Sequence, residues 1–186
     1  MKTVREVGEP LGVRVRVYHM DEARLGQQGT TTRVWAPTGS RPSAVKQTRY
    51  EWLYLFAAVE SATGASVALQ APSANTETMN VFLRMLSESL EPKDHAVLIM
   101  DGAGWHKAKK MVVPENVTIL YLPPYSPELN PVERLWAYLR SHYLANRAYD
   151  DYQHLLDAGA EAWQQLTPEL LRSVCACPYL EHVIEA

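Results

Sequence analysis

The stretch LPPYSPELNPVERLWAYLR, residues 122–140, decides the fold predicted for this chain. Its first half contains four prolines, and its second half has the apolar spacing of an amphipathic helix. Asn130 is a good helix N-cap, Pro131 suits the first helical position, and Glu133 then falls at the third. Two interpretations of Glu133 stay open: it closes a capping box, or the helix holds its carboxylate toward another group.

Apolar runs on the N-terminal side of this stretch predict strands. Continuous runs at 52–60, 95–101 and 117–123 are typical of buried strands, and 65–71 is a hairpin partner for 52–60. Residues 13–20 alternate apolar and basic side chains, which predicts a half-buried strand with Asp21 at its end. Residues 30–36 are expected to form a short extended piece.

Helical spacing predicts the remaining elements. A helix over 76–90 begins after Ser73 or Asn75, a short helix follows around 107–112, and the last helix spans about 150–166. The inward positions of the first and last of these helices are Met79, Phe82, Leu83, Leu86, Leu90, Leu155, Leu156, Ala160, Trp163 and Leu166. A strand meander followed by alternating helices and strands predicts an α/β, RNase H-like fold with a mixed central sheet flanked by helices.

Composition is typical of a single globular domain. The chain has 186 residues, of which 47% are hydrophobic and 21% charged. No apolar run is long enough for a membrane span, and the N-terminus lacks the pattern of a signal peptide. Cys175 and Cys177 are the only cysteines, which favours a reduced, cytoplasmic setting. With His182 they could bind a metal, or they are two ordinary small residues.

The charge balance argues mildly against a general nucleic-acid binder, because the net charge is −3. Basic side chains are nevertheless clustered locally, which leaves both phosphate contacts and scattered solvated charges open. The clustered residues are Arg41, Lys46, Arg49, Lys107, Lys109, Lys110, Arg134 and Arg140.

Three acids stand out by position. Asp21 and Asp101 each follow an apolar strand, and Glu133 opens a helix. If the first two strands lie side by side and parallel, the aspartates meet at one sheet edge, where their repulsion calls for a cation. Oxygen-only ligands with open positions suit Mg²⁺ or Mn²⁺, and two such ions about 3.5–4 Å apart can clamp an in-line phosphoryl transfer.

Three blocks resemble the catalytic domain of DDE transposases, in the bacterial insertion-sequence branch of the mariner superfamily. The blocks are DEARLGQQGTTTRVWAPTGSRP (21–42), LIMDGAGWHKAK (98–109) and LPPYSPELNPVERLWAYLR (122–140), and the likeness covers about residues 13–166. The resemblance implies that Asp21, Asp101 and Glu133 are the catalytic, metal-binding triad for two Mg²⁺ or Mn²⁺ ions.

The same resemblance implies Mg²⁺-dependent cleavage of DNA at transposon ends and strand transfer into target DNA, by a homodimer in the bacterial cytoplasm at the nucleoid. We expect residues 1–186 to form a single RNase H-like catalytic domain, since the chain is long enough for one domain with a sizeable core. Only about a dozen residues precede the first strand. The helix-turn-helix DNA-binding region of complete transposases is therefore expected to lie on a separate polypeptide, or to have been removed or lost.

Further roles follow from position. Strand alternation points Glu22 away from Asp21, which favours a supporting role. His106 orients a phosphate or water, or makes a local hydrogen bond at a helix start. Trp35 and Trp136 are expected to pack rather than to stack on bases. Arg24 and the lysines at 107–110 are candidate phosphate contacts.

Two rival functions remain. The triad alone does not separate a transposase from an RNase H-like nuclease that cuts without strand transfer. A non-catalytic, transposase-derived DNA-binding module is the other alternative, although the presence of all three acids speaks against it.

Overall fold

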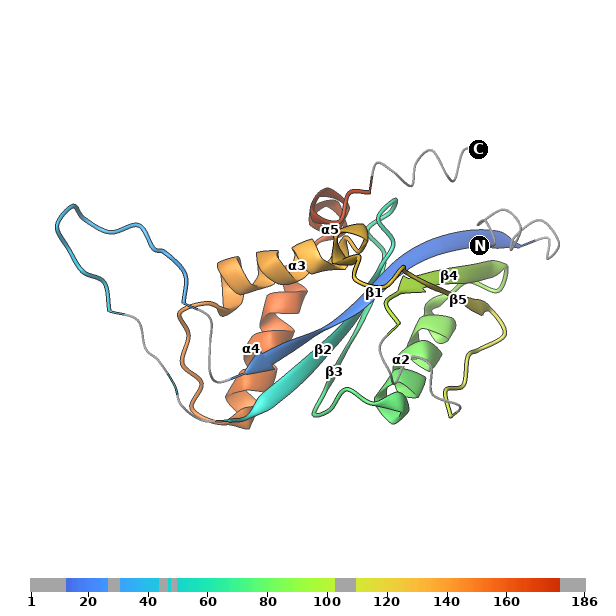
Figure 1. Ribbon diagram of the computed structural model, residues 1–186, viewed down its shortest axis with the longest axis horizontal. Helices are drawn as coiled ribbons and strands as arrows, with labels where there is room; N and C mark the ends of the chain where they lie inside the picture. The colour runs from blue at the N-terminus through green and yellow to red at the C-terminus, as the bar shows by residue number, and fades with distance from the viewer. Residues whose placement is uncertain (1–12, 27–30, 44–46, 48–49, 103–109, 178–186) are drawn as a thin grey trace.

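The computed structural model describes residues 13–26, 31–43, 47, 50–102 and 110–177. Its described strands form one five-stranded sheet in the order β3-β2-β1-β4-β5 (Figure 1). These strands are β1 (Arg14–Gly26), β2 (Trp52–Val59), β3 (Ser66–Ala71), β4 (Asp94–Met100) and β5 (Val117–Tyr121). The pairs β1–β2 and β2–β3 are antiparallel, whereas β1–β4 and β4–β5 are parallel. The predicted mixed sheet is confirmed.

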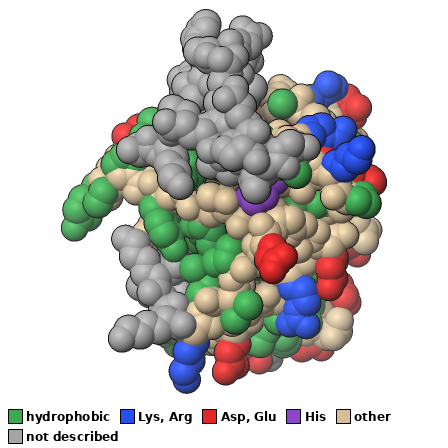
Figure 2. Space-filling view, turned by 90° about the vertical axis from the view of Figure 1, so that its right-hand side faces the viewer, with side chains coloured by type: hydrophobic (Ala, Val, Ile, Leu, Met, Phe, Trp, Pro, Cys, Tyr) green, Lys and Arg blue, Asp and Glu red, His purple; other side chains and the backbone are tan. Residues whose placement is uncertain are grey.

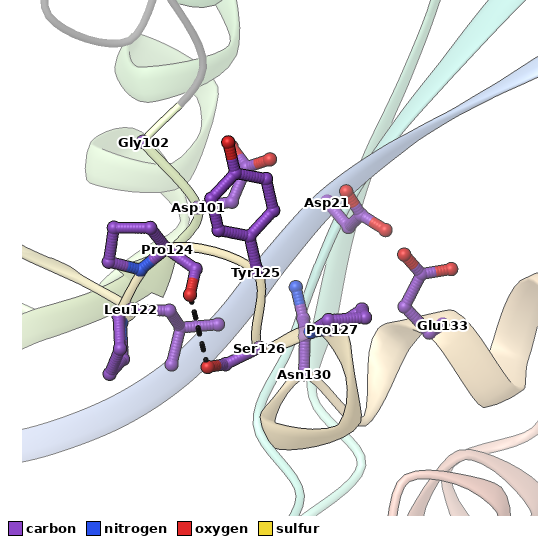
Figure 3. Close-up of a pocket in the computed structure, with 11 residues that line it drawn as sticks. Asp21, Asp101, Gly102, Leu122, Pro124, Tyr125, Ser126, Pro127, Asn130 and Glu133 are labelled. Atoms are coloured by element: carbon purple, nitrogen blue, oxygen red, sulfur yellow. Dashed lines mark hydrogen bonds between the residues drawn. The ribbon is translucent and has the colours of Figure 1, made fainter.

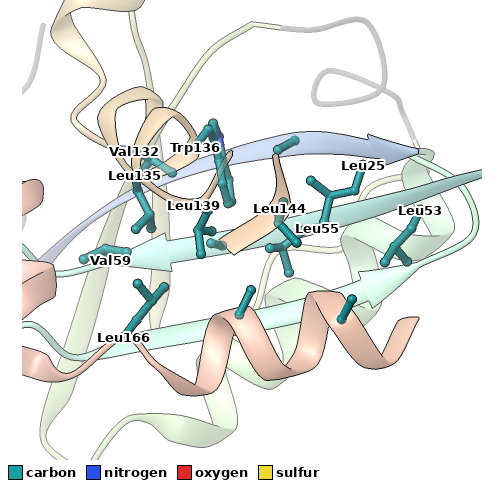
Figure 4. Packing of buried hydrophobic residues seen from close by; sticks show 14 of the residues in the cluster. Leu25, Leu53, Leu55, Val59, Val132, Leu135, Trp136, Leu139, Leu144 and Leu166 are labelled. Carbon is teal, nitrogen blue, oxygen red and sulfur yellow. The ribbon is translucent and has the colours of Figure 1, made fainter. Parts of the chain in front are cut away.

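Helices cover both faces of the sheet. Helix α2 (Thr76–Ser89) packs on one face, where its apolar stripe meets the side chains of Met20 and Phe56. Helices α3 (Val132–Leu139), α4 (Tyr152–Gln164) and α5 (Pro168–Val174) share a core cluster with the other face (Figure 4). Within the described residues, no helix is long and apolar enough to cross a membrane.

Helix α2 was predicted closely, helix α5 was missed, and a third predicted helix lies mostly outside the described residues. Asn75 caps α2 by accepting a hydrogen bond from the Thr78 amide, as its position predicted. Helix α5 was not predicted, because Thr167 and Pro168 were not recognised as a cap and a first helical residue. Most of the short helix predicted at 107–112 lies outside the described residues, and residues 111 and 112 are not helical.

Strand β1 is longer than predicted, and this corrects the position of Asp21. The strand was expected to end at residue 20, but it continues to Gly26. The reason is a change of partner: pairing with β4 ends at His19, while antiparallel pairing with β2 continues from His19 to Gly26. Asp21 therefore lies inside a strand, at the level where its parallel neighbour stops.

The segment 31–43 runs away from the sheet and is exposed throughout (Figure 1). Its described residues contain no strand, so the extended piece expected at 30–36 is not a part of the sheet. Trp35 is fully exposed, at 105% of its reference area, so the expectation that it packs in the core is wrong. Trp136, at 2% exposed, does pack in the core.

An ion-pair network fixes the start of β1 and hence its register. Arg14 donates to both carboxylate oxygens of Asp94, at 2.6 and 3.0 Å, and these two residues are also register partners across the parallel pair. Arg16 donates through Nε to Glu60 at 3.1 Å and through Nη1 to Asp94 at 3.4 Å. The Arg14 guanidinium holds the pKa of Asp94 below its usual range. A slip of one residue would break this network and turn every side chain of β1 to the opposite face.

The β2–β3 turn supplies a stability prediction. Gly64 has φ +77°, and a Cβ built there would lie 2.1 Å from the carbonyl oxygen of Pro168 in α5. Gly64→Ala should therefore lower the free energy of unfolding by about 2–4 kcal/mol, measured by chemical denaturation.

Gly39 is the matched control. Its φ is +84°, but a Cβ there would meet nothing within 4 Å, so Gly39→Ala adds only backbone strain of about 1 kcal/mol. Equal losses of stability in the two variants would contradict the predicted clash with α5.

Candidate active site

The parallel pairing of β1 and β4 brings two of the predicted acids together. The last paired residues are His19 and Ile99, so two residues further along each chain lie Asp21 and Asp101. Asp101 directly follows β4, while β1 continues past Asp21. The two strands are therefore adjacent and parallel, as the prediction of a shared site for these aspartates required.

The proline-rich segment after β5 carries Glu133 to the same place. The amide of Leu122 extends the sheet by bonding to the Met100 carbonyl at 2.8 Å, and a 3-10 turn then forms at Pro127–Leu129. Helix α3 begins at Val132, so Glu133 lies in its first turn.

Glu133 does not form a capping box with Asn130. The backbone amide of Asn130 donates to the Pro127 carbonyl at 2.9 Å, so it is not available to the Glu133 carboxylate. The Asn130 side chain instead accepts from the Val132 amide at 3.2 Å. Figure 3 shows the carboxylate of Glu133 turned toward Asp21.

One pocket of about 430 Å³ includes all three predicted acids in its lining (Figure 3). The lining residues are Asp21, Asp101, Gly102, Leu122, Pro123, Pro124, Tyr125, Ser126, Pro127, Asn130 and Glu133. At its edge, Tyr125 has φ +60° and is fully exposed. The left-handed backbone of a bulky residue is a strained conformation of the kind often found at functional sites.

Asp21 lies in an environment that disfavours its charge. Burial, reinforced by repulsion from Glu133, raises its pKa from 3.8 to about 7. The Trp136 indole opposes this shift by donating to Asp21 Oδ2 at 2.9 Å. A pocket that holds two facing carboxylates in this way favours a bound cation.

The donor set fits a hard divalent cation. The charged side chains that line the pocket are carboxylates, and Mg²⁺ and Mn²⁺ prefer such oxygen ligands. Among the residues that the structure describes, no three His, Cys, Asp or Glu side chains converge closely enough to hold one ion. Asp21 and Glu133 face each other, and Asp101 lies farther along the lining (Figure 3).

Other sequence predictions have mixed outcomes. Glu22 follows Asp21 in an extended strand, so its side chain lies on the opposite face, as predicted. Arg24 stacks on Trp52, with its guanidinium 4.0 Å from the ring centre. His106, most of the basic cluster at 107–110, and His182 lie outside the described residues. Cys175 and Cys177 are both buried.

Sequence reasoning missed the roles of Asn130 and Trp136 at this site. Both were interpreted locally, as a helix cap and a packing residue. Their spacing contained the signal, because residues 130, 133 and 136 recur at intervals of three, which places their side chains on one side of α3 and of the segment that leads into it.

A family model described as DDE superfamily endonuclease matches residues 16–156, most of the chain and all three acids. This chain belongs to the DDE superfamily endonucleases. The resemblance inferred from the three sequence blocks is thereby confirmed at the level of the family, which is a family of endonucleases.

Two curated proteins are similar to this chain in sequence. An uncharacterized protein of Sinorhizobium fredii, y4pE/y4sA, is 42% identical over 118 residues, which are 63% of this chain and 87% of that protein. An uncharacterized 39 kDa protein of insertion element IS630 from Shigella sonnei is 25% identical over 156 residues, 82% of this chain and 46% of that protein. The chain thus spans about half the length of the IS630 protein.

Solved structures of Mos1 transposase have the same fold. The Mos1 mariner paired end complex with Mn superposes with a TM-score of 0.66 at 19% identity, over 91% of this chain and 54% of the Mos1 chain. The Mos1 strand transfer complex gives 0.61 at 16% identity, with the same coverage. The RNase H-like fold class predicted from the order of elements is confirmed.

Proposed function

We propose that this chain is the catalytic domain of a transposase, which cleaves DNA at transposon ends and joins the freed ends to target DNA. The observation that carries the proposal is that Asp21, Asp101 and Glu133 line one pocket in a chain of the DDE superfamily. Their wide separation in sequence makes a chance meeting of these three acids a poor explanation.

The proposed ligands of two Mg²⁺ or Mn²⁺ ions are the carboxylates of Asp21, Asp101 and Glu133. When bound, such ions would polarise the scissile phosphate and activate the attacking water or 3′-hydroxyl. Asp21 and Glu133 supply a concentrated negative charge, which attracts the cations and offsets their charge beside a polyanion. Proline residues at 123, 124 and 127 restrict the backbone that forms one wall of the pocket.

The proposed partners are transposon-end and target DNA, a second copy of the chain, and a separate helix-turn-helix polypeptide. On the face in Figure 2, described side chains of both charges are interspersed around apolar surface, without a broad basic patch. With a net charge of −3, the chain has little general attraction for DNA. A separate basic module would add sequence-specific binding to transposon ends, at the nucleoid in the bacterial cytoplasm.

A strand-transfer assay tests the proposal. Oligonucleotide duplexes carrying the terminal repeats that flank the gene are supplied in pre-cleaved form with a supercoiled target plasmid and Mg²⁺ or Mn²⁺. Covalent joining of the duplex to the plasmid is the expected result. Hydrolysis without joining would identify a nuclease, and Mn²⁺ binding without either reaction would identify a non-catalytic module.

Metal binding is a separate prediction, and it is measured without DNA. Titration of the metal-free chain with Mn²⁺ in a calorimeter at pH 8 should show saturable binding, because Asp21 is then mainly ionised. Glu133→Gln should weaken that binding at least tenfold, whereas exposed Glu88→Gln on α2 should not change it. Equal Mn²⁺ affinities in these two variants would contradict the assignment of Glu133.

A further inference from the structure

Asn130, Glu133 and Trp136 follow one another at intervals of three along the start of α3. This spacing places the three side chains on the same side of the helix and its approach, facing β1. Glu133 is the residue that the proposed function assigns to the metal. The two residues on either side of it each make a hydrogen bond to β1.

The first bond joins the backbone of β1 to the beginning of α3. Asn130 is 5% exposed, and its Nδ2 donates to the Met20 carbonyl at 2.9 Å. Its Oδ1 accepts from the Val132 amide at 3.2 Å, so both ends of the side chain are used. The Met20 carbonyl directly precedes Asp21, and it lies one residue beyond the point where β4 stops pairing with β1. Asn130 therefore connects the two elements where the sheet no longer supports this side of β1.

The second bond reaches the side chain of Asp21 itself. Trp136 Nε1 donates to Asp21 Oδ2 at 2.9 Å. The indole ring is 2% exposed and packs in the core cluster between α3 and the sheet, so its position is fixed by its neighbours (Figure 4). One carboxylate oxygen of Asp21 is thus anchored, while the residue still lines the pocket that Glu133 faces.

From this geometry we propose that Asn130 and Trp136 are positioning residues that hold Asp21 at a fixed distance and orientation relative to Glu133. One bond ties the backbone beside Asp21 to the start of α3, and the other ties its carboxylate to the second turn. In the Asn-Pro-x-Glu-x-x-Trp motif, the proposed metal-binding glutamate thus lies between two residues that each hydrogen-bond to β1. The inference rests on the proposed function, because it assigns these residues to a divalent-cation site.

Trp136→Phe tests the inference, because it removes the N–H donor and keeps an aromatic ring in the core. Trp163→Phe is the matched control: Trp163 packs against the same core cluster from α4 and does not line the pocket. Mn²⁺ affinity of each metal-free variant is measured by calorimetry, together with its thermal midpoint. We expect Trp136→Phe to bind Mn²⁺ about tenfold more weakly, and Trp163→Phe to bind it like the wild type.

A kinetic measurement on the same variants separates positioning from simple loss of stability. Trp136→Phe should need about tenfold more Mn²⁺ for half-maximal cleavage, and it should recover at high Mn²⁺ with an unchanged KM for DNA. Unchanged Mn²⁺ affinity in Trp136→Phe, or an equal loss in both tryptophan variants, would overturn the inference. Failure of the wild-type chain to bind Mn²⁺ would instead overturn the proposed function.

Asn130→Ala provides a second, independent variant at the other anchor. It removes the bond to the Met20 carbonyl and the bond from the Val132 amide. We expect Mn²⁺ affinity to fall in this variant as well, even when it is compared with wild type at temperatures where both are folded. A folded Asn130→Ala chain with wild-type Mn²⁺ affinity would remove Asn130 from the proposal.

Discussion

Replacing Asp101 with Asn should abolish divalent-cation-dependent DNA cleavage while leaving the fold intact. Asn keeps the size of the side chain and removes its charge, so the pocket loses one of three proposed metal ligands. Loss of the metal's contribution to transition-state stabilisation is expected to lower kcat by about 10³-fold or more. The fold should survive because Asp101 is exposed and lies after the end of β4. The measurements are initial cleavage rates with Mg²⁺ and Mn²⁺, and circular dichroism.

Asp157→Asn is the matched control, because this residue is exposed on α4 and contacts Gln153 rather than the pocket. It should cleave DNA at the wild-type rate. Cleavage retained by Asp101→Asn, with the metal requirement unchanged, would refute the assignment of Asp101. Loss of cleavage in both variants would show that the assay responds to something other than the proposed site.

Local pattern was sufficient to predict much of the fold. Strand β2 was predicted because its residues 52–59 form a nearly continuous apolar run, which is typical of a strand buried on both faces. Helix α2 was predicted from its spacing, and its cap from Asn75. In α2 the buried residues repeat with the helical period, and in β2 the unbroken apolar run itself marks the strand, so in both elements neighbours in sequence contain the information.

What the sequence could not predict depends on contacts between distant residues. Strand β1 continues past Asp21 because β2 still pairs with it, and nothing near Asp21 in the sequence indicates that partner. Trp35 was expected to pack because large aromatic side chains usually do, but segment 31–43 lies away from the sheet. The capping box was a reasonable local prediction for Glu133, and a bond between Asn130 and the Pro127 carbonyl replaced it.

The site lies where the sheet changes its pairing. Up to His19, β1 pairs with β4; from His19 onward it pairs with β2, and the side that faced β4 has no described strand beside it. The space left by β4 is where Asp21 meets the segment after β5 and the start of α3. A pocket can form there because one side of β1 is released from the sheet, and the bond from Asn130 to Met20 replaces part of the support that is lost.

The burial of Asp21 beside Glu133 predicts a conflict between stability and function at this residue. In the metal-free chain, its pKa of about 7 exceeds the ordinary value of 3.8, mainly because of burial and then because of Glu133. The folded chain therefore binds the Asp21 proton more tightly than the unfolded chain does. For this group the free energy of unfolding falls as pH rises from about 4 to about 7, and it stays low at higher pH.

Asp21→Asn should accordingly stabilise the metal-free chain at pH 8, although it abolishes cleavage. Asn cannot ionise, and its amide oxygen can still accept the bond from Trp136. We expect a gain on the order of 2 kcal/mol at pH 8, after allowance for the residual exposure of the side chain. The measurement is chemical denaturation of both proteins in chelator at several pH values.

Two comparisons make this prediction specific to Asp21. At pH 4 the wild-type carboxyl is mainly protonated when folded, so the advantage of the variant should largely disappear. At pH 8, added Mn²⁺ should stabilise the wild type and not the variant, because an ion that binds only the folded state stabilises it and the variant lacks the Asp21 carboxylate that would hold the ion. Exposed Glu161→Gln on α4 should leave both responses unchanged. An Asp21→Asn chain that is no more stable than wild type at pH 8 without metal would mean that burial and Glu133 do not disfavour the Asp21 charge.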